Sequence, residues 1–88
     1  MPININELKK KIKYRSNYRG TKEMDLLLGS FVDSTLPKLS YNELLDLLNL
    51  LEHDDDSLYK FNQGNTGDIK IEKNTVSDLF KEFKIKKK

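Results

Sequence analysis

The sequence has no cysteine, no tryptophan and a single histidine, His53. Without cysteine, the chain can form neither a disulfide framework nor a zinc-thiolate site, and it has no thiol nucleophile. A single histidine leaves few side chains that exchange protons near neutral pH, so we expect no independent enzyme activity. The chain also lacks any apolar run near the roughly 20 residues that cross a bilayer, and its first residues show no signal or transit pattern. These absences predict a non-catalytic, cytoplasmic protein of bacterial type that does not insert into membranes.

Charge is unevenly distributed along the chain, although the net charge of its 88 residues is only +2. Residues 1–22 sum to +6, residues 23–59 to −8 and residues 60–88 to +4. This layout suits a partner with patches of both signs better than a uniform polyanion, so we expect no nucleic-acid partner. The basic ends still leave one alternative, a small helical protein associated with nucleic acid or the ribosome.

Apolar residues repeat at helical spacing over most of the chain. Helices are expected over about 5–18, after Thr21 up to Pro37, over 41–51, shortly after residue 54, and from Asn74 or Thr75 to residue 83. Residues around 69–71 form an extended connector, since no partner strand is in sight. The expected inward residues are Ile5, Leu8, Ile12, Tyr14 or the stem of Arg15, Met24, Leu27, Leu28, Phe31, Val32, Leu36, Tyr41, Leu44, Leu45, Leu48, Leu51, Leu58, Tyr59, Phe61, Val76, Leu79, Phe80 and Phe83. Leu47 and Leu50 widen the stripe of the third helix, so this helix is expected to be central.

These elements predict an all-α fold, a small bundle of four to five short helices. The length fits one domain, residues 1–88, with an ordered core at about 5–83 and a frayed basic tail at 84–88. Gly20 is expected to end the first helix in a left-handed conformation, and Gly29 suggests that another helix crosses closely there.

An acidic stretch follows the third expected helix. His53 with Asp54, Asp55 and Asp56 has the residue types of a metal cluster, but the spacing is not that of an EF-hand loop. We therefore expect a solvated acidic corner that caps the next helix, and no metal site.

The turn from Arg19 to Glu23 joins the first two expected helices. Gly20 breaks the first helix, Glu23 complements the N-terminus of the second, and the arginine is free to project from an exposed turn. A local Arg19–Glu23 ion pair would contribute at most about 1 kcal/mol, so alanine at Arg19 should hardly change stability.

The order of residues in two blocks, 18–31 and 50–61, resembles the succinate dehydrogenase flavinylation factors, the SdhE-type assembly family. The specific part is the R-G-x-x-E signature followed by an acid, here Arg19, Gly20, Glu23 and Asp25, and the resemblance covers about residues 8–64. This chain departs from the family pattern at Tyr18, Thr21, Asp56 and Phe61, where arginine, methionine, proline and tryptophan are usual.

The resemblance implies a five-helix bundle that binds the flavoprotein subunit of succinate dehydrogenase, or of fumarate reductase, and promotes covalent attachment of FAD to that subunit. It implies a chaperone-like binding module in which FAD is the partner's cofactor and is not bound stably by this chain. We expect the protein to be monomeric on its own, although the sequence leaves the oligomeric state open. The implied partner-binding residues are Arg19, Gly20 and Glu23, with Tyr18, Lys22 and Asp25 beside the turn and Glu52, Asp55 and Phe61 on the acidic corner.

Overall fold

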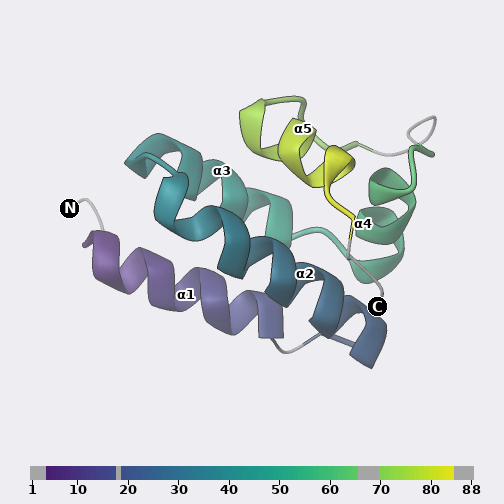
Figure 1. The fold of residues 1–88 in the computed structure, drawn as a ribbon, viewed down its shortest axis with the longest axis horizontal. Helices are drawn as coiled ribbons and strands as arrows, with labels where there is room; N and C mark the ends of the chain where they lie inside the picture. The colour runs from purple at the N-terminus through teal and green to yellow at the C-terminus, as the bar shows by residue number, and fades with distance from the viewer. Residues whose placement is uncertain (1–3, 18, 66–69, 85–88) are drawn as a thin grey trace.

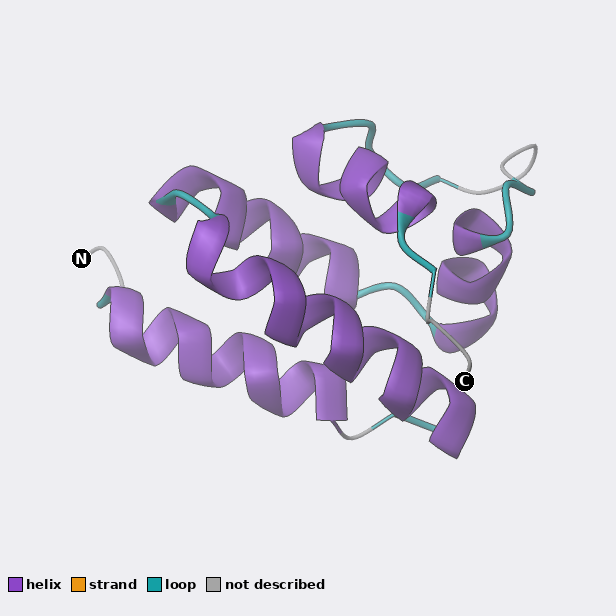
Figure 2. Ribbon diagram, viewed as in Figure 1, coloured by secondary structure: helices purple, strands orange, loops and turns teal. Residues whose placement is uncertain are grey.

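The computed structural model describes residues 4–17, 19–65 and 70–84. Within these ranges the chain forms five α-helices and one 3-10 turn, with no strand (Figure 2). The elements are α1 (Ile5–Asn17), α2 (Lys22–Thr35), η1 (Leu36–Lys38), α3 (Tyr41–Leu51), α4 (Asp55–Asn62) and α5 (Thr75–Glu82). The prediction of a small all-α bundle is confirmed, and each helix lies close to its expected place. Tyr18 and the tail at 85–88 lie outside the described residues.

Local capping interactions explain why the helices begin where they do. The Thr21 hydroxyl accepts a hydrogen bond from the Met24 N–H at 3.2 Å. Ser40 and Glu43 form the expected capping box, in which the Ser40 N–H donates to the Glu43 carboxylate at 2.9 Å. Such caps provide hydrogen-bond acceptors for the first N–H groups of a helix, which have no partner inside the helix. The capping residues in the sequence therefore determine where each helix begins.

Helix α3 is central to the packing, as Figure 1 shows. Helix α1 packs along both α2 and α3, whereas α5 packs on α3 and α4 packs on α5. Gly29 in α2 marks the crossing of α1, because a Cβ there would lie 3.3 Å from the Asn17 side-chain oxygen. The prediction of a close helix crossing at Gly29 is therefore confirmed. None of the described helices is both long and apolar enough to cross a bilayer.

The core joins apolar residues from all five α-helices and η1. The Phe31 ring lies 5.1 Å from the Phe80 ring and 5.4 Å from the Phe83 ring, and Phe61 stacks on Phe80 at 6.3 Å. Aromatic rings at these distances attract each other in preferred orientations, which stabilises the core beyond the burial of their apolar area. The buried apolar residues are Leu8, Ile12, Met24, Leu27, Leu28, Phe31, Val32, Leu36, Leu44, Leu47, Leu50, Leu51, Leu58, Phe61, Val76 and Phe80.

Several expected core residues lie at the surface instead. The exposed fraction is 41% for Ile5, 63% for Tyr14, 48% for Tyr59 and 42% for Leu79, because short or terminal helices bury only one narrow face. In α3, Leu47 and Leu50 are buried, which confirms that they widen the inward stripe. The expected residues Tyr41, Leu45 and Leu48 are only half-buried against the core. This helix packs on both α1 and α5, so its buried face is broader than one stripe.

The buried polar residues Ser16, Asn62 and Ser77 were not predicted from sequence. Asn62 is buried, and its amide donates to the carbonyl oxygens of Phe80 at 2.7 Å and Phe83 at 2.8 Å. Both carbonyls lie at the C-terminal end of α5, where the Phe80 oxygen also accepts a hydrogen bond from the Phe83 N–H at 3.1 Å. A buried asparagine amide therefore joins the end of α4 to the end of α5.

Candidate functional site

The guanidinium group of Arg19 lies between the α1–α2 turn and the α3–α4 turn. Its Nε donates to Asp55 Oδ1 at 2.7 Å. One terminal nitrogen donates to the carbonyl oxygens of Arg15 at 3.1 Å and Leu51 at 3.0 Å, and the other donates to the carbonyl oxygen of His53 at 2.8 Å. The side chain is only 10% exposed. The arginine is thus an internal connection between two turns that are far apart in sequence.

This arrangement uses properties that lysine lacks. Guanidinium is planar and presents several donors in fixed directions, so it can reach a carboxylate and three carbonyl groups at once. The carbonyls of Arg15 and Leu51 belong to the last turns of α1 and α3, where the helix dipole favours a positive charge. Arg19 therefore stabilises the ends of two helices as well as the turn between α3 and α4.

Two further hydrogen bonds hold the backbone of the signature turn. The Arg19 N–H donates to Asp25 Oδ1 at 2.6 Å, and the Gly20 N–H donates to Asp55 Oδ2 at 2.8 Å. A Cβ at Gly20 would lie 3.1 Å from the same Asp55 oxygen, which is tighter than an ordinary contact. We refer to Arg19, Gly20, Asp25 and Asp55 as the signature corner.

Two expectations about this turn were wrong. Gly20 does not have a positive φ; among the described residues only Gly64 does, at 89°. Glycine is needed at residue 20 because a carboxylate approaches its backbone. Arg19 does not project into solvent and does not pair with Glu23, because the acidic α4 N-terminus and three carbonyls surround it. Glu23 is exposed and makes no hydrogen bond or ion pair with the described residues, and Lys22 is exposed beside it.

The remaining predicted contact residues have different surroundings. Glu52 forms an exposed ion pair with Arg15. Phe61 is 7% exposed and belongs to the core, so its ring is not available as a surface contact. Tyr18 lies outside the described residues. Of the residues predicted to bind a partner, the structure thus leaves Glu23, Lys22 and Glu52 exposed, and gives Arg19, Asp25 and Asp55 intramolecular partners.

The acidic corner caps α4. Asp54 accepts hydrogen bonds from the Ser57 hydroxyl at 2.8 Å and the Ser57 N–H at 3.2 Å, and the hydroxyl bond, followed by the N–H bond, lowers the pKa of this carboxyl group. Asp56 pairs with Lys60 at 3.1 Å on the exposed side of α4. Within the described ranges, histidine, aspartate and glutamate form no cluster of three that suits a metal ion.

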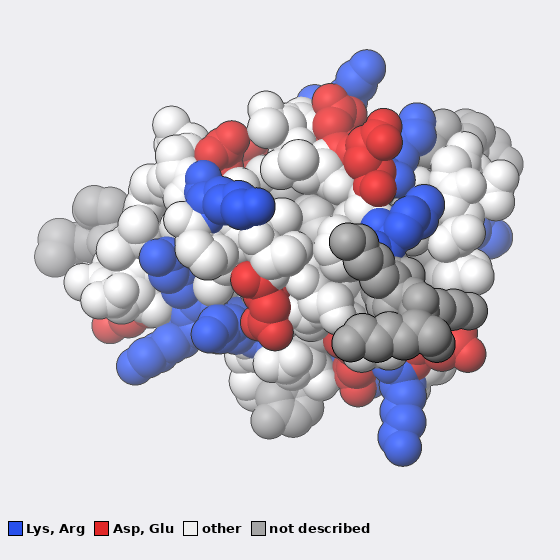
Figure 3. All heavy atoms as spheres, viewed as in Figure 1, with Lys and Arg blue, Asp and Glu red and all other residues white. Residues whose placement is uncertain are grey.

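Folding mixes the charges that the sequence separates. On the face shown in Figure 3, basic and acidic side chains alternate over the surface, and neither sign forms one continuous patch. The capping and pairing interactions described above bring basic α1 and the turn after it against the acidic end of α3 and the start of α4.

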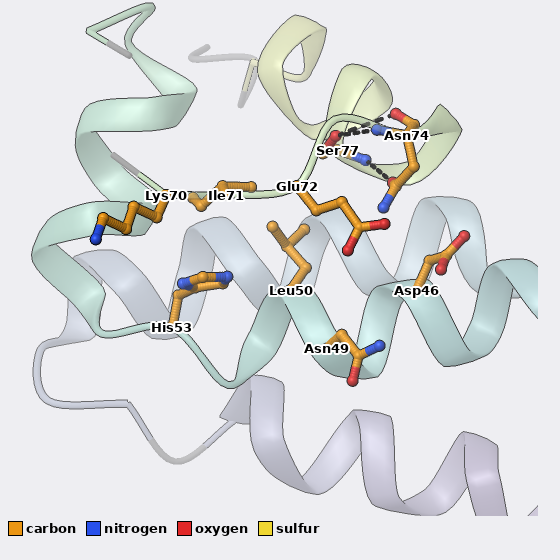
Figure 4. Close-up of a pocket in the computed structure, with 9 residues that line it drawn as sticks. All are labelled: Asp46, Asn49, Leu50, His53, Lys70, Ile71, Glu72, Asn74 and Ser77. Carbon is orange, nitrogen blue, oxygen red and sulfur yellow. Dashed lines mark hydrogen bonds between the residues drawn. The ribbon is translucent and has the colours of Figure 1, made fainter. Parts of the chain in front are cut away.

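A pocket that the sequence did not indicate lies between α3, residues 70–73 and the start of α5 (Figure 4). Its volume is about 170 Å³, below the roughly 300–1,000 Å³ typical of pockets for drug-sized ligands. It is lined by Asp46, Asn49, Leu50, His53, Lys70, Ile71, Glu72, Asn74 and Ser77.

Comparison with known proteins identifies the family. Residues 10–84, which include the signature corner, match the family described as "Flavinator of succinate dehydrogenase". The chain belongs to this family. The expected resemblance to the flavinylation factors is therefore confirmed.

Three individual proteins are similar in sequence to this chain. The chain is 38% identical over 55 residues to "FAD assembly factor SdhE" of Acetobacter pasteurianus, covering 62% of this chain and 50% of that protein. It is 40% identical over 57 residues to "Succinate dehydrogenase assembly factor 2, mitochondrial" of Dictyostelium discoideum, covering 65% of this chain and 40% of that protein. A third relative, "FAD assembly factor SdhE" of Legionella pneumophila, is 43% identical over 47 residues, covering 53% of this chain and 60% of that protein. The matched part thus spans about half the length of these relatives. The comparison with solved structures found no match for this chain.

Proposed function

We propose that this protein binds the flavoprotein subunit of succinate dehydrogenase and promotes covalent attachment of FAD to it. The observation that carries the proposal is that the chain belongs to the flavinator family through a segment containing the complete signature corner. The names of the relatives, two FAD assembly factors and one succinate dehydrogenase assembly factor, support the same role.

The geometry supports a division of labour within the signature. Arg19 and Gly20 fix the turn through internal hydrogen bonds, whereas Glu23 and Lys22 are exposed on the first turn of α2. A rigid turn loses little conformational entropy on binding, so a charge presented by it can contribute more to affinity. In this proposal Arg19 and Gly20 are positioning residues, and Glu23 and Lys22 contact the client.

The proposed role is not catalytic. The factor binds one arrangement of the flavoprotein more tightly than others. This difference in affinity increases the fraction of flavoprotein molecules that can form the covalent flavin bond. We propose that FAD stays in the flavoprotein and is not bound stably by this chain.

A flavinylation assay with limiting factor tests the proposal. The flavoprotein subunit of succinate dehydrogenase is produced without its factor, supplied with FAD and this protein, and its covalent flavin is read by fluorescence on a denaturing gel. Glu23→Gln should slow flavinylation about tenfold or more, because a central charged contact can contribute 2 kcal/mol or more to binding. Asp33→Asn, an exposed acid on the same helix, should leave the rate unchanged. A parallel assay with the flavoprotein subunit of fumarate reductase identifies the client.

Two results would contradict the proposal. Wild-type flavinylation with Glu23→Gln at limiting factor would exclude the proposed contact, and no stimulation by the wild-type chain would exclude the function. Binding to random DNA with a steep dependence on salt would instead favour the nucleic-acid alternative.

A further inference from the structure

The segment from Lys70 to Lys73 passes along α3 in an extended conformation without a partner strand (Figure 4). Its backbone N–H and C=O groups make no hydrogen bond with any described residue. The first paired backbone group after it is the Asn74 N–H, which donates to the Ser77 hydroxyl at 2.8 Å. Such a segment presents the main-chain groups of an edge strand, onto which another extended chain can pair.

The pocket beside this segment also contains unpaired side chains. Five side chains that line the pocket form no hydrogen bond or ion pair with any described residue. They are Asp46, Asn49, His53, Lys70 and Glu72. Figure 4 shows the carboxylates of Asp46 and Glu72 toward the α5 side, and Lys70 and His53 at the opposite end. The pocket floor is apolar, formed by Leu50, which is buried, and Ile71, which is half-buried.

We propose that this site binds an extended peptide, which pairs with the backbone of residues 70–73 and places an arginine or lysine side chain between Asp46 and Glu72. The proposal concerns a surface separate from the signature turn and does not depend on the proposed function.

Charge and alternation specify the peptide. Lys70 and Glu72 are two residues apart, so in an extended segment they lie on the same face. Opposite charges in facing positions of two strands attract, so the ligand needs a basic residue opposite Glu72 and an acidic residue opposite Lys70, two positions apart. The long aliphatic stem of arginine or lysine suits the apolar floor, while the cationic end reaches Asp46 and Glu72.

Amide NMR titration of the full chain tests the proposal. The probe is the blocked heptapeptide acetyl-Thr-Val-Arg-Val-Glu-Val-Thr-amide. Saturable shifts are expected for the amides of Ile71, Glu72 and Lys73. The variants Asp46→Asn and Glu72→Gln should each weaken binding about threefold to tenfold, as expected for loss of one charge-assisted contact. The control Glu82→Gln, an exposed acid on α5 outside the pocket, should bind like the wild type.

Modified peptides separate the two parts of the proposal. Replacing arginine with norleucine should weaken binding about fivefold or more, since the ion contacts are lost and the stem is kept. Two further peptides are N-methylated, one at the odd and one at the even positions. Only one of them should lose binding, because alternate N–H groups of a strand point to opposite sides and only one side pairs with residues 70–73.

Four outcomes would overturn the proposal. They are the absence of shifts at residues 70–73 at millimolar peptide, equal affinity of the norleucine peptide, equal affinity of both N-methylated sets, and equal affinity of arginine amide alone. The last outcome would make the pocket a site for a small cation and not for a strand.

Discussion

The signature corner and the pocket beside α3 contain similar residue types, but their polar groups are used differently. In the corner, the Arg19 guanidinium and both Asp55 oxygens have partners inside the chain. In the pocket, the carboxylates of Asp46 and Glu72 have none among the described residues. His53 belongs to both, since its carbonyl accepts from Arg19 and its side chain lines the pocket. Satisfied polar networks specify a fold, whereas unsatisfied groups remain available to a ligand.

This comparison changes the meaning of the family signature in this chain. An exposed arginine would be an anchor for a partner, but Arg19 is 10% exposed and connects two turns. The exposed acid of the signature, Glu23, keeps its charge available. In this signature the arginine therefore has a structural role, whereas the neighbouring Glu23 is the residue available to contact a partner.

The largest expected effect is at Arg19. Arg19→Ala should lower the free energy of unfolding by about 2–4 kcal/mol, because it leaves Asp55 and three carbonyl groups without their main partner. Chemical denaturation measures this change. Arg19→Lys should recover only part of the loss, since lysine cannot reach all these acceptors at once. A change below about 0.5 kcal/mol for the alanine variant would mean that the corner does not hold the fold.

A smaller effect is expected at Gly20. Gly20→Ala should cost about 1 kcal/mol, because a Cβ 3.1 Å from Asp55 Oδ2 displaces the carboxylate that holds Arg19. The Arg19→Ala/Gly20→Ala double variant should lose less than the sum of both single variants, since residues in one network are not additive. Additive losses in the same denaturation experiment would show that the two residues act independently.

Asp54 should give a modest dependence of stability on pH. Its pKa is lowered in the folded protein, chiefly by the hydrogen bond from the Ser57 hydroxyl. The stabilisation is therefore present above the pKa of the unfolded chain, and it is lost as pH falls through the lower pKa of the folded state. Wild type should be more stable than Asp54→Asn at neutral pH, and thermal unfolding should show this difference vanish in acid. An unchanged difference at low pH would contradict the assignment.

The smallest effects are expected in the pocket. Glu72→Gln and Asp46→Asn should each change the free energy of unfolding by no more than about 0.5 kcal/mol, because neither carboxylate supports another described group. These variants are measured beside Arg19→Ala under the same conditions. Losses above about 1 kcal/mol would remove the distinction between the two regions.

Most of the fold could be predicted because it is encoded locally. The apolar repeat of α2 and the capping box at Ser40 each act within one or two turns, so a single sequence contains the whole signal. The contacts of Arg19 could not be predicted in the same way. Two of its acceptors are the carbonyl oxygens of Leu51 and His53. Every residue has a backbone carbonyl, so the residue type does not indicate which carbonyls will accept a hydrogen bond from a distant side chain. The pocket arises from packing of residues 70–73 on α3, which no local pattern indicates.

The buried amide of Asn62 has a consequence for the motions of the protein. It binds the carbonyl of Phe80 in the last turn of α5 and that of Phe83 directly after the helix. Helix α5 has eight residues and forms one wall of the pocket. Short helices with few buried contacts can open locally in the native state, with free energies below that of global unfolding. Since opening of α5 breaks these hydrogen bonds and removes that wall, amide hydrogen exchange in α5 reports how often the pocket exists. We therefore expect loss of the Asn62 amide to increase hydrogen exchange in α5, although Asn62 does not itself line the pocket.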